Sequence, residues 1–245
     1  MISVCMATYN GEKYIAKQLE SILGQISKED EIIVSDDQSS DTTMEIIKEF
    51  NDSRIKIFSN NSTHGFTPNF QNALKRAGGD IIFLSDQDDV WLPNKVEKTL
   101  QKLKYCDLAI SDCTVVDGNG DRISDSRFAE LNVRGTKIEH LIKSKYLGCC
   151  MAFSSLLIPY ILPFPNRYDL IEHDIWIAAV GFTFFKVGII REPLIEYRRH
   201  GNNVSDGGFG KGYSLPKKIE KRVYRLSKLA KLATRIPIAK TKGRD

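Results

Sequence analysis

Short apolar runs alternate with helical patterns through residues 2–103 of this chain. The apolar runs cover residues 2–7, 31–35 and 80–85, and residues 54–59 alternate between polar and apolar as a strand does. Helical spacing of apolar side chains follows these four segments at residues 14–23, 41–50, 67–77 and 95–103. A continuous apolar run is typical of a strand that is covered by helices on both faces of a parallel sheet. The alternation therefore predicts an α/β fold with a Rossmann-like, mostly parallel central sheet flanked by helices.

The second half of the chain is less regular. We expect strands at residues 107–111, 147–154, 182–188 and 193–197, helices at residues 138–143 and 172–180, and a hairpin-type turn at residues 116–120. These assignments rest on apolar runs and on turn-forming residues between them.

The composition is that of a soluble globular protein, with 42% hydrophobic and 27% charged residues among 245. The five cysteines show no Cys-x-x-Cys spacing, and their odd number indicates reduced thiols. The chain opens almost directly on an apolar run, and no apolar stretch approaches the ~20 residues that span a bilayer. We therefore expect a cytoplasmic protein.

The positive charge is concentrated in the tail. Residues 211–245 hold twelve Lys and Arg against two acids, whereas the other 210 residues hold 23 basic and 29 acidic side chains. The acidic main body argues against nucleic acid as a partner. In the tail, apolar residues recur every three or four positions, at Leu215, Ile219, Val223, Leu226, Leu229, Ala233 and Ile236. This predicts a basic amphipathic helix that binds a membrane surface, or alternatively one that packs on the domain with a solvated basic face.

Three carboxylates, Asp86, Asp88 and Asp89, follow the apolar run at residues 80–85. Unpaired carboxylates this close repel one another unless a cation lies between them. Mg²⁺ and Mn²⁺ accept one or two such ligands while a substrate phosphate supplies other oxygens. The cluster therefore indicates a site for a divalent metal, with a solvated Asp-rich turn as the alternative.

Polar side chains also follow two other runs, at residues 8–10 and at Asp36 and Asp37. In open α/β sheets, ligands bind beyond the carboxyl ends of the strands, so the three clusters favour a shared site. Asp36 and Asp37 suit a nucleobase or ribose, although a helix-capping turn explains them equally. No Gly-rich phosphate cradle follows the first run, so phosphates would be held through the metal.

Three segments together resemble the family 2 glycosyltransferases. They are Ala-Thr-Tyr-Asn-Gly-Glu-Lys-Tyr at residues 7–14, Val-Ser-Asp-Asp-Gln-Ser-Ser-Asp-Thr-Thr at residues 34–43, and Phe-Leu-Ser-Asp-Gln-Asp-Asp-Val-Trp at residues 83–91. The resemblance covers residues 1 to about 205 and implies an inverting, metal-dependent enzyme with the GT-A fold. It also implies a GT-A domain at residues 1–210, with a nucleotide-sugar half at 1–111 and an acceptor half at 112–210, followed by the tail at 211–245.

The resemblance implies a role for each matching residue. The donor nucleotide-sugar would be bound by Thr8, Tyr9, Asn10, Glu12, Asp36, Asp37, Asp86, Gln87 and Arg198. Of the acidic pair, Asp37 is favoured for the base. Asp88 and His200 would bind Mn²⁺ or Mg²⁺, and Asp89 would support Asp88. A lone histidine is more often structural, which is the alternative for His200.

The segment Glu-His-Asp-Ile-Trp at residues 172–176 resembles the family's acidic motif at the start of an acceptor-side helix. Asp174 would be the general base, with an ordinary helix cap as the alternative. His173 and Trp176 would contact the acceptor, although Trp176 also suits the core. Cys149 and Cys150 are interpreted as packing residues.

These features predict transfer of one sugar from a UDP- or dTDP-linked donor to a saccharide acceptor. The chain lacks the Gln-x-x-Arg-Trp motif of processive synthases, which favours a single transfer. The motif sequences resemble those of rhamnosyltransferases in the family. We expect an enzyme that builds a bacterial surface polysaccharide, such as capsule or O-antigen, on a lipid carrier. We expect peripheral attachment at the inner face of the cell membrane. The alternatives are a nucleotidyltransferase that makes the nucleotide sugar and a non-catalytic sugar-binding domain.

Overall fold

One continuous sheet organises the molecule. In the computed structural model, which describes residues 1–142, 144–200 and 213–235, this sheet has nine strands. The strands are β1 (Ile2–Thr8), β2 (Glu31–Asp36), β3 (Ile55–Ser59), β4 (Ile81–Asp86), β5 (Val90–Trp91), β6 (Leu108–Asp117), β7 (Arg122–Ser124), β8 (Met151–Ser154) and β9 (Val187–Arg199). Their order is β3-β2-β1-β4-β8-β6-β9-β5, and β7 pairs with β6.

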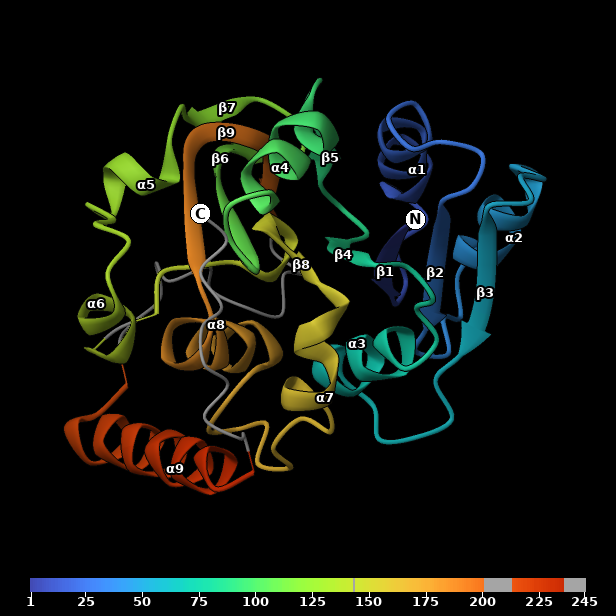
Figure 1. Cartoon of the computed structure of the whole chain (residues 1–245). Coiled ribbons are helices and arrows are strands. Elements are labelled where there is room, and N and C mark those ends of the chain that lie inside the picture. The colour runs from blue at the N-terminus through green and yellow to red at the C-terminus, as the bar shows by residue number, and fades with distance from the viewer. Residues whose placement is uncertain (143, 201–212, 236–245) are drawn as a thin grey trace.

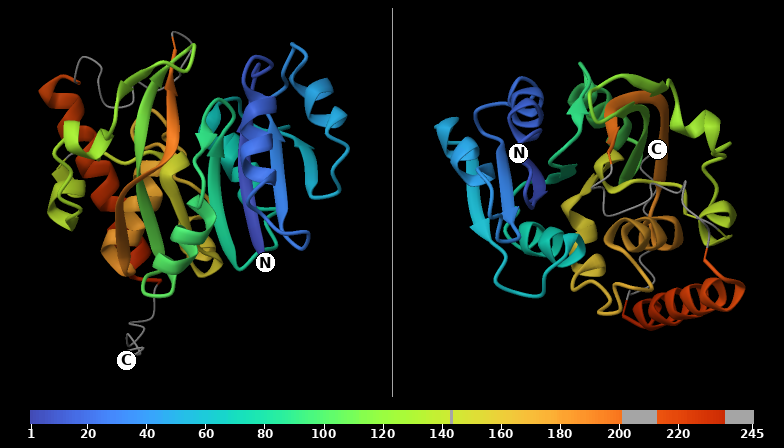
Figure 2. Two further views of the ribbon diagram at one scale, coloured as in Figure 1. Left: turned by 90° about the horizontal axis from the view of Figure 1, so that it is seen from above. Right: turned by 180° about the vertical axis from the view of Figure 1, so that it is seen from behind.

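Helices cover both faces of the sheet. They are α1 (Ile15–Leu23), α2 (Thr43–Glu49), α3 (Phe66–Leu74), α4 (Lys95–Leu103), α5 (Arg127–Glu130), α6 (Lys137–Ile142), α7 (Ile158–Ile161), α8 (His173–Phe184) and α9 (Leu215–Ala233). In Figure 1, α1 and α4 lie above the sheet and α3 and α8 below it, and the rear view in Figure 2 agrees. No helix among these described residues is both long and apolar enough to cross a membrane.

The first half of the chain folds as its alternation predicts. Strand β1 pairs in parallel with β2 and β4, and β2 pairs in parallel with β3. In β1 and β2 almost every residue is buried, which agrees with a sheet covered on both faces. The parallel register places Thr8 beside Asp36 and Ala7 beside Asp86. The polar clusters after β1, β2 and β4 therefore meet at one edge of the sheet.

The second half contains both correct and incorrect expectations. Strand β6 is longer than expected, and the turn at residues 116–120 does join β6 to β7 as a hairpin. The expected strand at 182–188 is wrong in its first part, because Phe182–Phe184 continue α8 as a helix whose apolar residues surround it on most sides. Residues 187–199 form one strand instead of two. Residues 148–150 form a 3₁₀ turn before β8, which shortens the strand expected at 147–154.

The sheet as a whole is mixed. Strands β6 and β9 are parallel, whereas β5, β7 and β8 make antiparallel pairs. The register between β6 and β9 shifts on both sides of Asp112, where the partner is Pro193. Proline cannot donate to the ladder, so a bulge at this point is expected. Beyond the bulge, β9 pairs with β5 through Val90 and Glu196. This pairing joins the segment after β4 to the end of β9.

Candidate active site

The loops that follow β1 and β2 are tied to each other. The Asn10 backbone N–H donates to Ser39 Oγ at 2.9 Å, and Asn10 Oδ1 accepts from the Ser40 N–H at 2.8 Å. Asn10 has a φ of 47°, a left-handed conformation that asparagine tolerates. Glu12 Oε2 accepts from both the N–H and the hydroxyl of Thr42, at 3.1 and 2.7 Å. Asn10 and Glu12 therefore shape the loops around the predicted donor site.

Gln87 links the loop after β4 to the loop after β1. Its Oε1 accepts from the Tyr9 N–H and its Nε2 donates to the Tyr9 carbonyl, both at 2.8 Å. A Cβ added at Gly11 would lie 2.3 Å from Gln87 Oε1, so a larger residue there would displace the Gln87 amide group. The Tyr9 side chain is 53% exposed. Gln87 thus positions the loop, and the ring of Tyr9 is the part that a ligand can reach.

Asp36 and Asp37 are both buried, and each holds a different segment. Asp36 accepts from the Thr8 hydroxyl at 3.0 Å and from the Ser39 N–H at 2.9 Å. Asp37 accepts from Asn60 Nδ2 and from the Gly65 N–H, both at 2.7 Å. Asp36 therefore stabilises the turn after β2. Asp37 fixes the loop between β3 and α3, and sequence reasoning did not identify Asn60.

Two buried amides hold the carboxyl ends of the strands. Gln18 Nε2 donates to Ser85 Oγ at 2.8 Å and to the Asp86 carbonyl at 3.1 Å. Asn69 Nδ2 donates to the Thr8 carbonyl at 3.1 Å. Sequence reasoning missed both residues. The available signal was a polar side chain on the otherwise apolar face of a helix, because such a group needs a partner when it is buried.

Asp88 and His200, the two predicted metal ligands, lie together. His200 Nε2 is 2.8 Å from Asp88 Oδ2, and the two side chains are 16% and 15% exposed. The ring of Tyr14 stacks on His200 with centroids 5.0 Å apart. A carboxylate and an imidazole that face each other in a partly open position are suited to a divalent cation. Residues 201–205, which complete the predicted motif around His200, lie outside the described part of the chain.

Asp86 and Asp89 form a second acidic group beside Asp88. Ligand atoms of these two residues and of Cys149 lie within 4.8 Å of one another. Burial, and then the charge of Asp88, raise the pKa of Asp86 to about 7 and the pKa of Asp89 well above its usual value. Asp89 Oδ2 is buried without a hydrogen-bond partner in the described residues. The carboxylates thus fit a bound cation, and Cys149, interpreted from sequence as a packing residue, lies against them.

A buried lysine lies beneath this acidic group. Lys95 is 1% exposed, and its Nζ is 3.5 Å from the Cys149 carbonyl. The ammonium group also lies over the rings of Phe83 and Trp91, 5.9 and 5.1 Å from their centroids. Burial lowers the pKa of Lys95, whereas the charge of Asp89 raises it. Lys95 therefore offsets part of the buried negative charge, a role that sequence reasoning missed.

Arg198, predicted to bind the donor, is buried beside the acidic loop. The residue is 4% exposed, its Nε donates to the Asp88 carbonyl at 2.9 Å, and its Nη1 donates to the Asp117 carbonyl at 3.1 Å. Its backbone N–H donates to Asp89 Oδ1 at 3.0 Å. These bonds direct the guanidinium at the backbone of the acidic loop, and a contact between Arg198 and the donor stays a prediction. Arg198 is a positioning residue for Asp88 and Asp89.

The first turn of α8 presents Asp174 to the same region. Burial, and then the charge of Glu172, raise the pKa of Asp174 to about 8, and the charge of Asp86 adds to the effect. The Asp174 carboxylate Oδ1 accepts from the Ile175 N–H at 2.6 Å. A carboxyl group whose pKa lies near the working pH is suited to proton transfer. Asp174 and Asp86 thus belong to one electrostatic group, although 88 residues separate them in sequence.

Replacing Glu172 with glutamine tests this coupling. The substitution removes a negative charge that raises the pKa of Asp174, so the ionised base should persist to lower pH. We expect the acid limb of the rate–pH profile to move to lower pH while the maximal rate changes little. Steady-state rates from pH 5.5 to 9 measure the shift. An unchanged profile with a lower maximal rate would contradict the coupling.

His173 and Trp176, predicted to contact the acceptor, are buried in this structure, as the alternative for Trp176 expects. The His173 ring stacks on Phe70 with centroids 4.3 Å apart, and a Cβ added at Gly148 would lie 2.6 Å from its Nε2. Trp176 is 4% exposed, and its Nε1 donates to the Ile161 carbonyl at 3.0 Å. The side chains that flank Asp174 therefore point into the core, where α8 packs on α3 and α7.

His173 should make the fold sensitive to acid. Burial lowers its pKa from 6.5 to about 3, so it binds a proton more readily when unfolded. Its contribution is intact above pH 6.5 and is lost as the pH falls from there toward 3. Relative to His173→Phe, the free energy of unfolding of the wild type should fall by about 1.4 kcal/mol per pH unit in that window. Urea unfolding of both proteins at pH 8 and 5.5 measures the difference, and equal pH dependence would contradict it.

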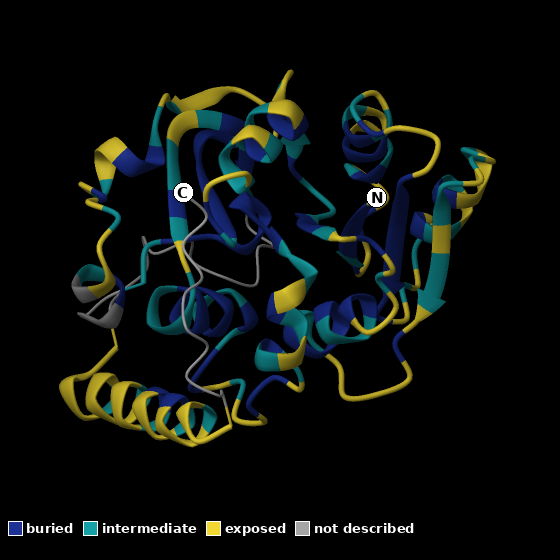
Figure 3. Cartoon of the chain, in the orientation of Figure 1, coloured by how far each residue is buried: buried dark blue, intermediate teal, exposed yellow. Residues whose placement is uncertain are grey.

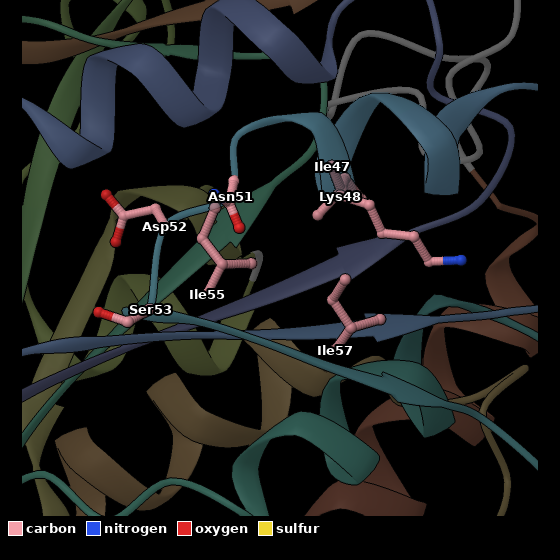
Figure 4. A pocket seen from close by; sticks show the side chains of 7 residues that line it. All are labelled: Ile47, Lys48, Asn51, Asp52, Ser53, Ile55 and Ile57. Atoms are coloured by element: carbon pink, nitrogen blue, oxygen red, sulfur yellow. The ribbon is translucent and has the colours of Figure 1, made fainter.

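Two surface pockets differ in their relation to this site. The pocket in Figure 4, of about 320 Å³, lies between α2 and the edge strand β3 and is lined by Ile47, Lys48, Asn51, Asp52, Ser53, Ile55 and Ile57. It lies at the start of β3, away from the carboxyl ends of the strands. A second pocket, of about 190 Å³, is lined by His64–Pro68, Tyr168, Asp169, Glu172 and Tyr213. Through Glu172 it adjoins the start of α8, and hence the candidate site.

Comparisons with known proteins identify the family. The family model described as glycosyl transferase family 2 matches residues 3–190. An Escherichia coli protein named UDP-Glc:alpha-D-GlcNAc-diphosphoundecaprenol beta-1,3-glucosyltransferase WfgD is 31% identical over 216 residues, which are 85% of this chain and 81% of that protein. The dTDP-rhamnosyl transferase RfbG of Shigella flexneri is 28% identical over 215 residues, 81% of this chain and 72% of that one. The chain belongs to glycosyl transferase family 2 and is a glycosyltransferase.

The fold agrees with this assignment. A crystal structure of S. aureus TarS residues 1–349 in complex with UDP-GlcNAc superposes with a TM-score of 0.67. The match covers 96% of this chain and 72% of that one at 20% sequence identity. The arrangement is the expected GT-A fold. Membership of the family sets aside the nucleotidyltransferase and the non-catalytic sugar-binding domain.

Proposed function

We propose that this chain transfers one sugar from a nucleoside diphosphate sugar to a hydroxyl group of a saccharide acceptor, with inversion at the anomeric carbon. One observation carries the proposal. The facing pair Asp88 and His200, the carboxylate of Asp86 and the raised-pKa carboxyl of Asp174 gather at the carboxyl ends of the strands. This is where ligands bind in open α/β sheets.

The donor would occupy the edge formed by the loops after β1, β2 and β4. The exposed ring of Tyr9 offers a stacking surface for the base, and the Asp37 backbone N–H donates at 2.9 Å to the carbonyl of Thr8, the residue before Tyr9. Asp86 would meet the ribose or the donor sugar. Gln87 and Asn10 hold these loops at fixed positions, so little ordering is needed when the donor binds.

Asp88 and His200 would hold a divalent cation, Mn²⁺ or Mg²⁺, with Asp89 in support. When bound, such a cation neutralises charge on the departing nucleoside diphosphate. Arg198 keeps the acidic loop in place through the Asp88 carbonyl. The positive charge of the buried Lys95 offsets part of the negative charge of Asp89.

Asp174 would act on the acceptor. A sugar hydroxyl is a weak nucleophile, and a carboxylate within hydrogen-bond reach can remove its proton as the new bond forms. The attack would come from the face of the sugar opposite the diphosphate, and a single displacement inverts the anomeric centre. Water must be kept from the donor meanwhile, which the buried surroundings of the base favour.

The relatives suggest the setting of the reaction. The Escherichia coli relative is named for a UDP-linked glucose donor and a diphosphoundecaprenol-linked acceptor, and the Shigella relative for a dTDP-linked rhamnose donor. By analogy, we propose a UDP- or dTDP-linked donor and a lipid-linked acceptor in the synthesis of a bacterial surface polysaccharide. The chain would act at the inner face of the cell membrane as a peripheral protein.

A screen of donors tests the proposal. Purified protein is heated with UDP, dTDP and GDP and with their sugar conjugates, each with and without Mn²⁺. A ligand that binds the native state raises the melting temperature by mass action. The expected result is stabilisation by one nucleotide class that requires the metal, followed by release of that nucleoside diphosphate when an acceptor is added. If none of the nucleotides raises the melting temperature in a metal-dependent way, the proposal is contradicted.

A further inference from the structure

Helix α9 has two different faces. It packs on α8, and its inner face carries Leu229 and Arg225, which are 5% and 7% exposed. Polar contacts join it to the loop before α8, with Lys217 Nζ 3.3 Å from Asp169 Oδ2. In Figure 3 the side of α9 toward α8 is blue and teal and the opposite side is yellow. The sequence predicts one apolar face that includes Leu229, and the structure divides those apolar residues between two faces.

The outer face carries an apolar stripe. It consists of Leu215, Ile219, Val223 and Leu226, which are 70%, 52%, 60% and 53% exposed. Their spacing of four, four and three residues places them within about 80° of arc on a helix with 3.6 residues per turn. Among the described residues, only Ile123 and Leu156 are other Ile, Leu or Val side chains exposed to this extent. The stripe is therefore a local concentration of exposed apolar surface, which indicates an interaction site.

The charge around the stripe selects the partner. Residues 215–233 contain seven Lys and Arg side chains and one Glu. Lys218 and Arg222 are exposed and border the stripe along its length. A second copy docked on the stripe would bring two strongly basic helices together, and like charges repel. A lipid bilayer with anionic head groups complements both the basic side chains, through its charge, and the apolar stripe, through its acyl chains.

We propose that α9 lies in the surface of an anionic lipid bilayer, with the outer stripe buried at the boundary between head groups and acyl chains. This inference extends the proposed peripheral attachment to a particular face of one helix. It rests on the proposed function only in assuming that the acceptor is carried on a lipid. Because the inner face stays packed on α8, binding requires no rearrangement of the domain. Figures 1 and 3 show α9 at the periphery of the molecule, with α8 between it and the sheet.

This placement gives the membrane a defined relation to the active site. Helix α8, which begins beside Asp174, is the element on which α9 rests. Tyr213, two residues before α9, lines the 190 Å³ pocket together with Glu172. A saccharide that is carried on a lipid would thus meet the protein near the start of α8. The base would lie one helix away from the bilayer surface.

Vesicle sedimentation of the full chain tests the inference. The protein is mixed with vesicles of phosphatidylcholine alone or of phosphatidylcholine with phosphatidylglycerol. The variant Leu215→Gln, Ile219→Gln, Val223→Gln and Leu226→Gln removes the stripe, and because these side chains are exposed it should melt at the wild-type temperature. Ile123→Gln with Leu156→Gln, at exposed apolar positions elsewhere, is the matched control. We expect the wild type and the control to bind the anionic vesicles at least tenfold more tightly than vesicles of phosphatidylcholine alone. The stripe variant should bind the anionic vesicles at least tenfold more weakly than the wild type.

Three outcomes would overturn the inference: equal binding of the stripe variant and the wild type, no binding of the wild type to anionic vesicles, or a wild-type dimer that the variant abolishes in light scattering. Release of nucleoside diphosphate with a water-soluble acceptor separates this inference from the proposed function. If the stripe variant keeps this release and loses vesicles, both stand. If no protein releases nucleotide but the vesicle result holds, only the proposed function fails.

Discussion

Replacing Asp88 with asparagine should reduce sugar transfer by at least ~10²–10³-fold, the loss that follows removal of one group that stabilises transition-state charge. Asparagine keeps the shape of the side chain but loses the charge that faces His200. The charge of Asp88 also raises the pKa of Asp86 and Asp89, so its removal relieves repulsion in the folded state. We therefore expect lost turnover with a melting temperature that is unchanged or higher. The assay is metal-dependent release of nucleoside diphosphate.

The matched control is Asp80→Asn. Asp80 immediately precedes β4, at the opposite end of the strand from the acidic group, and its exposed carboxylate pairs with the chain's amino group at 3.1 Å. Its loss should leave turnover near the wild-type level. Near-normal transfer by Asp88→Asn would show that the metal and the diphosphate are held elsewhere. Loss of transfer together with a lower melting temperature would point to a structural role instead.

Replacing Asp174 with asparagine should lower the transfer rate by ~10²–10⁴-fold, the usual contribution of a general base. Donor binding should persist, because the proposed donor contacts lie on the loops after β1, β2 and β4. The base works in its ionised form, so the wild-type rate should fall about tenfold per pH unit below a pKa of about 8 and level off above it. The residual rate of the variant should lack this dependence.

Two measurements separate the possible roles of Asp174. Metal-dependent thermal stabilisation by the donor reports binding, and single-turnover rates report the chemical step. A variant that no longer binds donor would contradict a role confined to the acceptor. Glu172→Gln serves as the neighbouring control, because it changes the electrostatic surroundings of Asp174 and leaves the base in place.

Much of the first half of the molecule follows from local patterns. Apolar residues dominate runs such as residues 31–35, and the polar residues after them mark where the strands end. In a parallel sheet these ends meet at one edge, so the position of Asp36, Asp37 and Asp86 near one another could be predicted. The helix that begins before Asp174 was equally clear, because its cap and its apolar residues are adjacent in sequence.

Other features depend on contacts between distant segments. Phe182–Phe184 have the apolar character of a strand, but they continue a helix because α8 is enclosed by the core on most sides. Arg198 has the chemistry of a diphosphate ligand, but its guanidinium is directed at the carbonyls of Asp88 and Asp117. Residue type and spacing cannot predict these outcomes, because they do not specify which surface a side chain meets.

By itself, the sequence determined the alternation of strands and helices, the acidic strand ends, the family and the basic helix at the end of the chain. The resemblance implied that Asp88 and His200 share a metal ion, and the tertiary structure shows how they meet, through pairing of β5 with β9 across more than 100 residues. The tertiary structure alone decided that the apolar residues of α9 are divided between α8 and the surface. The spacing of apolar residues in the sequence shows whether a segment is a helix or a strand. Packing of the whole chain decides which other segment each of its faces contacts.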